Sequence, residues 1–178
     1  SFCSGSIRIF LERGYCMTGH DIFPNPLHNH KDCINTALEK ADEICKLQGV
    51  KLTAQRRRVL ELVWGSHKPI GAYEVLDLLC EQDGKRPAPM TVYRALDFLI
   101  EQGLVHRLAS LNAYIGSTSL NSDHNSYFFV CDDCGQAAEV TDGNVQKAIS
   151  EKADRIGFII HLNTVEVSGR CSQCQDRA

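Results

Sequence analysis

The sequence lacks any run of about 18 apolar residues, the length that a membrane-spanning helix requires. It also lacks a metalloprotease HExxH motif, a glycine-rich phosphate loop and a nucleophile–base motif. The first sixteen residues have neither the long apolar core nor the small-residue cleavage site of a secretory signal. Met17 follows them, and whether the natural chain starts there stays open. These absences predict a cytoplasmic protein that is not an enzyme, uses no small-molecule substrate and contacts no membrane.

A strong excess of one charge is also missing, since the net charge is −3. The charges are nevertheless unevenly distributed: residues 35–110 hold 11 basic and 10 acidic side chains, whereas residues 111–178 hold 5 and 9. The basic side chains of the first part cluster at residues 56–58 and 85–86. Such clusters either are ordinary solvated faces or meet phosphates, and charge alone leaves both readings open.

Apolar residues recur at helical spacing in four segments between residues 32 and 103. We expect helices over about residues 32–48, 53–65, 71–84 and 89–103. Proline cannot occupy a helix interior, so the fourth helix starts near Pro89 or Met90. Two short extended pieces, "LVHRL" and "NAYIG", then predict a hairpin. Helices followed by a hairpin are the order of a winged helix-turn-helix, in which one helix enters the DNA major groove.

The polar segment 117–125 separates this part from a smaller one at residues 126–178. There, "SYFFVC" and "AAEVT" predict strands, a helix follows Asp142 and ends at Gly157, and "FIIHLNTVEVSG" predicts one long strand. The expected fold is therefore α+β. Residues 1–31 form a flexible leader, residues 32–116 a winged-helix DNA-binding domain, and residues 126–178 a small α/β domain.

Four of the nine cysteines form two Cys-x-x-Cys pairs, Cys131 with Cys134 and Cys171 with Cys174. Thiolates suit tetrahedral zinc, and each pair supplies two ligands from one turn. Four protein ligands leave no position for water or substrate, which predicts a structural zinc rather than a catalytic one. Free buried cysteines, or a zinc centre released by oxidation, are the alternatives.

The fourth predicted helix divides its residues between an apolar face and a polar N-terminal half. A recognition helix presents N-terminal side chains to base edges, and arginine can donate two hydrogen bonds to guanine. The polar candidates are Thr91, Tyr93 and Arg94. The alternative is that they decorate the solvent face of an ordinary helix.

Four stretches resemble, in order, the ferric uptake regulator family: "KLTAQRRRVLE", "GAYEVLDLL", "RPAPMTVYRALDFLIEQGLVHRL" and "FFVCDDCG". The segments "ALDFL" and "LVHRLASLNAYIG" resemble its zinc uptake regulator branch. The resemblance implies a homodimer that binds palindromic operator DNA when zinc-loaded and represses zinc uptake genes, with its C-terminal domain dimerising. It also implies that six side chains contact DNA, namely Arg56, Arg57, Tyr73, Thr91, Tyr93 and Arg94. Of these, Arg56 and Arg57 would contact phosphates.

The resemblance further implies a regulatory zinc site between the two domains. Its ligands in the zinc branch fall here on His106, position 117, His124 and Glu139. Position 117 is serine where the branch has cysteine, and a neutral hydroxyl is a poor zinc ligand beside a thiolate. Either three protein ligands and another group suffice, or the change weakens the site. Asp123 or His161 are alternative ligands.

Two other functions stay open on the sequence alone. One is a sensor of another metal or of peroxide in the same fold, although a single histidine before the first cysteine pair favours zinc over iron. The other is a redox-regulated zinc protein, such as a chaperone or thiol switch, without a DNA target. His20, His28 and His30 of the leader, and Cys33 just after it, are further candidate ligands, but exposed tail residues more often bind nothing.

Overall fold

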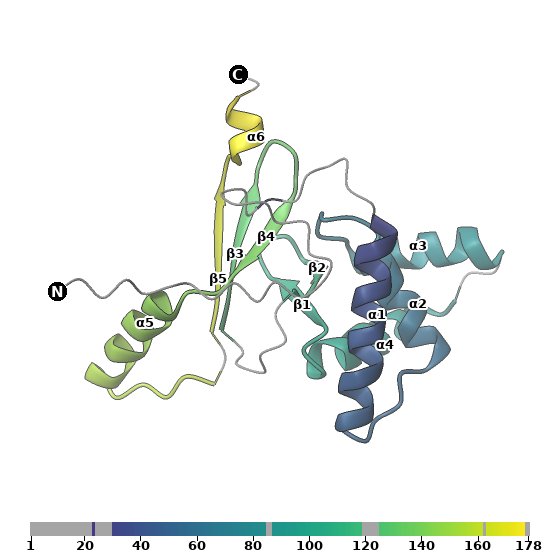
Figure 1. Cartoon of the computed structure of the whole chain (residues 1–178), viewed down its shortest axis with the longest axis horizontal. Helices are drawn as coiled ribbons and strands as arrows, with labels where there is room; N and C mark the ends of the chain where they lie inside the picture. The colour runs from purple at the N-terminus through teal and green to yellow at the C-terminus, as the bar shows by residue number, and fades with distance from the viewer. Residues whose placement is uncertain (1–22, 24–29, 85–86, 119–124, 162, 177–178) are drawn as a thin grey trace.

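The computed structural model describes residues 23, 30–84, 87–118, 125–161 and 163–176 of the 178-residue chain. Four helices and a hairpin form the N-terminal part, and a three-stranded sheet with two helices forms the C-terminal part (Figure 1). Among the sequence candidates, His20, His28, the basic pair at 85–86, Asp123 and His124 lie outside the described residues. None of the described helices is both long and apolar enough to cross a membrane.

The four expected N-terminal helices are confirmed, and the first begins two residues earlier than predicted. The hydroxyl of Thr53 caps the second by accepting a hydrogen bond from the Arg56 amide at 3.4 Å. Pro89 occupies the first turn of the fourth, and Gly103, with φ +67°, lies just beyond its end. The helices are α1 (His30–Leu47), α2 (Ala54–Val63), α3 (Ala72–Asp83) and α4 (Pro89–Glu101).

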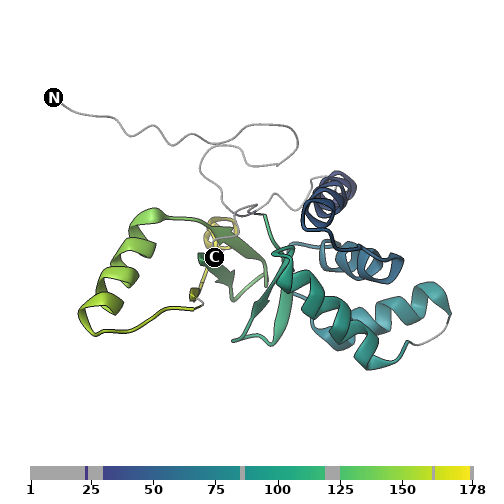
Figure 2. The same ribbon diagram turned by 90° about the horizontal axis from the view of Figure 1, so that it is seen from below.

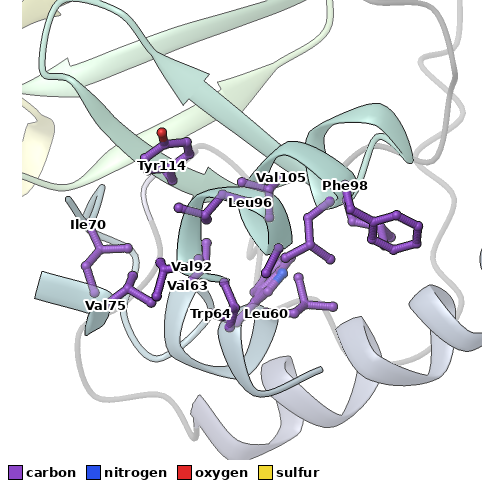
Figure 3. Close-up of a cluster of buried hydrophobic side chains, with 14 of the residues drawn as sticks. Leu60, Val63, Trp64, Ile70, Val75, Val92, Leu96, Phe98, Val105 and Tyr114 are labelled. Atoms are coloured by element: carbon purple, nitrogen blue, oxygen red, sulfur yellow. The ribbon is translucent and has the colours of Figure 1, made fainter. Parts of the chain in front are cut away.

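The helices and the hairpin share one apolar core, which Figure 3 shows in close-up. Leu60 from α2, Val75 from α3 and Leu96 from α4 are almost fully buried in it. Burying each such side chain stabilises the fold by about 1.5–3 kcal/mol. Gly116 lies against the core as well, because a Cβ atom there would overlap the indole ring of Trp64. This close approach fixes the backbone immediately before Ser117.

The predicted hairpin is confirmed as β1 (Val105–Leu108) and β2 (Ala113–Gly116). The strands pair antiparallel, with Val105 opposite Gly116, and Asn112 adopts a positive φ of 47° in the turn between them. Ile70, in the α2–α3 connection, exchanges two 2.8 Å backbone hydrogen bonds with Tyr114 of β2. The hairpin is thereby attached to the helices on the side of β2.

The C-terminal sheet has the strand order β4-β3-β5, from β3 (Asn125–Cys131), β4 (Ala137–Val140) and β5 (Asn163–Gly169). Strand β3 pairs antiparallel with β4 and parallel with β5. Helix α5 (Gly143–Arg155) connects β4 to β5, and Asp142 caps it as predicted. The short helix α6 (Ser172–Gln175) was not predicted from the sequence.

The long strand predicted from Phe158 is wrong in its first half, since β5 begins only at Asn163. The Phe158 amide instead donates to the carbonyl of Ala153 at 2.9 Å, and Gly157 has φ +67°. These residues therefore complete the C-terminal cap of α5 rather than extend a strand. Phe158 and Ile159 remain 62% and 75% exposed.

The hairpin lies between the helices and the sheet in both Figure 1 and Figure 2, and α5 lies on the far side of the sheet. A second buried apolar cluster joins the two parts there. It takes Leu108 and Ile115 from the hairpin, and Phe128, Val130 and Ala137 from the sheet. A backbone hydrogen bond of 3.1 Å from the Ala137 amide to the His67 carbonyl adds a further link.

Candidate metal centres and nucleic-acid interface

The four paired cysteines meet at one end of the C-terminal sheet. Cys131 ends β3, Cys134 lies in the following turn, and Cys171 and Cys174 flank and enter α6. Their sulfur atoms all lie within 4.8 Å of one another, and the Cys134 and Cys171 Sγ atoms are 3.9 Å apart. Four sulfurs held at about 2.3 Å from one zinc would be roughly 3.8 Å apart. The donor set and its spacing therefore fit a tetrahedral zinc ion.

Hydrogen bonds already favour a thiolate within this four-cysteine cluster. The Cys171 backbone amide donates to the Cys131 Sγ atom at 3.3 Å. This bond is the main cause that lowers the pKa of the Cys131 thiol, to about 6, while shared hydrogen bonding with Cys171 raises the pKa of Cys174. Metal binding must displace the remaining protons, so the metal affinity of such a cluster rises with pH.

A second cluster lies where the hairpin meets the sheet, and we call its five residues the hinge cluster. The His106 Nε2 atom lies 3.0 Å from the Ser117 Oγ atom and 3.1 Å from the Glu139 Oε1 atom. The Ser126 hydroxyl donates to Glu139 at 2.8 Å, and the Thr118 amide and hydroxyl donate to it at 2.7 and 2.9 Å. The cluster thus joins one residue of β1 and the two residues that follow β2 to one residue each of β3 and β4.

The carboxylate of Glu139 is the buried centre of the hinge cluster, with only 2% of its side chain exposed. Burial by itself raises the pKa of this group. The hydrogen bond and charge of His106, followed by hydrogen bonds from Ser126 and Thr118, outweigh that effect and lower the pKa to about 2. Glu139 is therefore an ionised, oriented oxygen donor at neutral pH.

Two separations in the hinge cluster, both measured from the His106 Nε2 atom, can be compared with those of a metal site. Nitrogen and oxygen ligands at about 2.0–2.1 Å from a tetrahedral zinc would be roughly 3.3 Å apart. The separations of 3.0 and 3.1 Å from His106 to Ser117 and Glu139 are close to this value. The structure thus brings three of the four predicted regulatory positions together, and His124 lies outside the described residues. His161 is exposed on the segment before β5.

Two members of the hinge cluster, Thr118 and Ser126, were not predicted as site residues. Strand alternation contains a signal for Ser126, because it shares a strand face with Phe128 and Val130, which contact the hairpin. Thr118 carries no such signal, since its two hydrogen bonds to Glu139 depend on how the hairpin meets the sheet.

The N-terminal half of α4 forms an exposed polar surface with the start of α3. Thr91 and Arg94 are exposed on α4, and Tyr73 of α3 is 64% exposed. The rings of Tyr73 and Tyr93 meet edge to face, with centroids 6.5 Å apart. The positive end of the helix dipole lies at the same place. Hydroxyl and guanidinium donors beside a helix N-terminus are suited to phosphates and base edges.

Arg56 and Arg57 instead have partners within the domain. The Arg56 guanidinium lies 3.5 Å above the ring of Phe98 and donates to the Lys51 carbonyl at 2.7 Å. Arg57 forms an ion pair with Asp42 of α1. Both arginines therefore connect α2 to its neighbours, and their contacts with phosphates stay a prediction.

Known proteins resemble this chain over most of its length. The model of the Ferric uptake regulator family matches residues 47–168. The zinc uptake regulation protein of Escherichia coli (strain K12) is 40% identical over 138 residues, which cover 77% of this chain and 80% of that protein. Its counterpart in Mycobacterium tuberculosis is 32% identical over 129 residues, which cover 71% and 96%.

Two solved structures are also similar. A zinc uptake regulator complexed with zinc and DNA is 38% identical, with a TM-score of 0.76, and the match covers 81% of this chain and 96% of that one. The crystal structure of holo XcZur has a TM-score of 0.73 at 38% identity, and the match covers 80% and 99%. The sequence motifs, the winged helix and the sheet domain agree with these matches, and the chain belongs to the ferric uptake regulator family.

Proposed function

We propose that this chain is a zinc-responsive transcriptional repressor that binds operator DNA as a homodimer and controls zinc uptake genes. The observation that carries the proposal is the hinge cluster, which joins the α4-bearing domain to the sheet. His106 follows the end of α4 by five residues, and Glu139 belongs to β4. A ligand held by both residues would fix the direction of α4 relative to the sheet.

The two metal centres have different roles in this proposal. One structural zinc is held by Cys131, Cys134, Cys171 and Cys174, within the sheet domain. A second, regulatory zinc is held by His106, Glu139 and His124, with Ser117 beside them. When bound there, zinc supplies a link between the domains stronger than the hydrogen bonds it replaces, and this link orients the recognition helix.

Exposed apolar side chains on the sheet domain support its proposed role in dimerisation. Phe129 and Val167 are about 40% exposed and lie opposite each other on adjacent strands. Contiguous exposed apolar residues commonly mark protein interfaces. A two-fold dimer would present two copies of α4 to a palindromic site, with Tyr73, Thr91, Tyr93 and Arg94 as DNA contacts. The proposal places the protein in the cytoplasm and gives it no catalytic role.

The test is operator binding as a function of free zinc. A duplex is selected from a random library with the zinc-loaded protein, and its affinity is measured by fluorescence anisotropy with buffered zinc or with chelator. We expect tight binding only with zinc. Arg94→Ala should weaken specific binding by about 1–3 kcal/mol, the loss of one bidentate base contact. Arg155→Ala, an exposed arginine on α5, is the matched control, and zinc-independent affinity of the wild type would refute the proposal.

A second candidate function, a sensor of another divalent metal, is favoured by one observation. Ser117 gives the hinge cluster nitrogen and oxygen donors in place of a thiolate. Such ligand sets suit metals like manganese and iron better than a thiolate-containing set does. The same anisotropy assay with manganese, iron(II) or cobalt decides between the two, since only the cognate metal should produce tight binding at low micromolar concentration or below.

A further inference from the structure

Glu166 makes a contact between the two domains that is separate from both metal centres. It lies in the middle of β5, in register with Phe128 of β3. Its carboxylate reaches the turn of the β1–β2 hairpin and accepts hydrogen bonds from the backbone amides of Ala109 at 2.7 Å and Ser110 at 3.2 Å. The Ser110 hydroxyl donates to the same carboxylate.

This geometry is that of an anion held by a turn. Two successive backbone N–H groups that point to one side form a small concave binding site for a carboxylate or phosphate oxygen. Hydrogen bonds to an ionised acceptor are about twice as strong as neutral ones. Partial burial would raise the pKa of Glu166, but the hydrogen bonds from Ser110 and Ala109 lower it below its ordinary value. Glu166 is therefore charged at neutral pH.

The turn itself is stiffened from within. The Arg107 guanidinium donates to the Asn112 side-chain oxygen at 2.9 Å, across the end of the hairpin. Asn112 has the positive φ that closes the turn, and its amide donates to the Ala109 carbonyl at 3.3 Å. Because these bonds keep the turn rigid, the turn and the two strands move together as one unit.

The hairpin is consequently held at three places along its length. His106 and Thr118 attach its open end to Glu139 of the sheet. Leu108 and Ile115 pack on the apolar face of β3 and β4. Glu166 attaches its closed end to β5. Since the hairpin begins four residues after α4, these three attachments help to set the direction of α4 relative to the sheet, together with the Ala137–His67 hydrogen bond.

We propose that Glu166 is a positioning residue, a metal-independent latch that holds the hairpin against the sheet. The latch sets the fraction of molecules that adopt the DNA-binding arrangement before the hinge cluster binds metal. The latch rests on the proposed function, because it regulates the same recognition helix. It also assigns the hairpin turn to the domain contact and not to DNA. The two turn amides that would bind a phosphate are already occupied by a carboxylate.

The latch should act by changing the fraction of the protein whose domains are arranged to bind DNA. When only a fraction of the protein is competent, the apparent dissociation constant rises in inverse proportion to that fraction. Removing the latch lowers the competent fraction, and metal at the hinge cluster restores most of it. The loss of operator affinity should therefore be large when zinc is scarce and small when zinc is saturating, a pattern that general damage to the fold does not produce.

The experiment compares Glu166→Gln and Glu166→Ala with wild type in the full-length protein. Glu151→Ala is the matched control, because it removes an exposed glutamate of α5 that faces Lys147. Hydrogen–deuterium exchange of residues 105–116 is measured with zinc at the four-cysteine cluster alone. Operator affinity is then measured across buffered zinc concentrations. Circular dichroism and one zinc per chain verify that each variant is folded.

We expect faster exchange in residues 105–116 of both Glu166 variants, and a loss of operator affinity of about three- to tenfold at limiting zinc that shrinks below about twofold at saturation. Ser110→Ala should reproduce part of the effect and add little to Glu166→Gln, since both remove one contact. Unchanged exchange would overturn the latch, and so would an affinity loss equal at all zinc concentrations. Failure of wild type to respond to zinc would overturn the proposed function alone, because the exchange readout does not use DNA.

Discussion

The four-cysteine cluster and the hinge cluster share one sheet but differ in what they connect. The cysteines lie at residues 131–174, within a single domain, and all four donors are sulfur. The hinge cluster takes His106 and Ser117 from one domain and Glu139 and Ser126 from the other, and its donors are nitrogen and oxygen. The first cluster can hold a domain together, whereas the second can only hold two domains to each other.

The clusters also differ in what holds them without metal. Thiols are weak hydrogen-bond donors and acceptors, so contacts such as the 3.9 Å pair of Cys134 and Cys171 contribute little. Glu139, in contrast, receives charge-assisted bonds of 2.7–2.9 Å from Thr118 and Ser126. Metal should therefore be a requirement for folding at the cysteines and a reversible addition at the hinge, which is what separates a scaffold from a sensor.

The largest effect that tests this difference is expected for Cys131→Ser. Structural zinc contributes about 10–16 kcal/mol of apparent binding free energy in small zinc domains, and the loss of one thiolate forfeits much of it. The sheet domain should lose its zinc and its cooperative unfolding, as measured by native mass spectrometry and thermal denaturation. Cys80→Ser, on α3 and outside the cluster, is the control and should retain both. If the Cys131→Ser variant folds without zinc, metal at the four cysteines is not required for folding, and the two clusters do not differ in this respect.

A smaller loss is expected for Glu139→Ala at the hinge. This change leaves the donors of Ser126 and Thr118 and the His106 ring without their shared acceptor, and an unsatisfied buried donor typically costs about 1–3 kcal/mol. The structure predicts separation of the domains with the four-cysteine zinc retained. Small-angle scattering should show the expansion, and metal analysis should show one zinc per chain. Collapse of zinc content to zero would mean that the two clusters fold as one unit.

The sequence predicted the four-cysteine cluster and the N-terminal helices because both depend on local patterns. A Cys-x-x-Cys pair presents two sulfurs from one turn whatever the rest of the fold does. The helices follow from apolar spacing, from Thr53 as a cap and from Pro89 at a helix start.

The hinge cluster and the latch could not be predicted fully, since they depend on strand register and domain packing. His106 and Glu139 entered through family resemblance, while Ser126 meets Glu139 because β3 and β4 pair in one particular register. Glu166 gave no signal at all, because its partners are 56 and 57 residues away in the other domain. The false strand at Phe158 has a local origin instead: β-branched and aromatic residues suit a strand, but these residues form the C-terminal cap of α5.

An intermediate effect is expected for Ser117→Cys, which would make the hinge more like the cysteine cluster. The Ser117 Oγ atom already lies 3.0 Å from the His106 Nε2 atom, so a thiolate there would join the ligand set without rearrangement. Zinc affinity at the hinge should rise by at least about tenfold, or about 1.4 kcal/mol, in competition titrations. Ser66→Cys, in the exposed turn after α2, controls for an added cysteine. An unchanged affinity would mean that position 117 does not face the metal.

The smallest expected effect concerns pH, and it isolates the contribution of Glu166 from that of the metal centres. The folded-state pKa of this carboxyl lies below its ordinary value of 4.5, so its stabilisation is fully present above that pH and is lost as the pH falls toward the folded value. The carboxylate is partly solvated, which limits the effect to less than about 1 kcal/mol.

The measurement is the difference in unfolding free energy between wild type and Glu166→Gln, followed by urea denaturation from pH 7 to pH 3. Both proteins share every other titrating group, including Glu139 and the four cysteines, so those contributions cancel in the difference. The difference should be constant near neutral pH and shrink below the ordinary carboxyl pKa. If this difference in unfolding free energy stays constant down to pH 3, the charge of Glu166 does not contribute to stability. The hairpin turn would then not bind an ionised carboxylate.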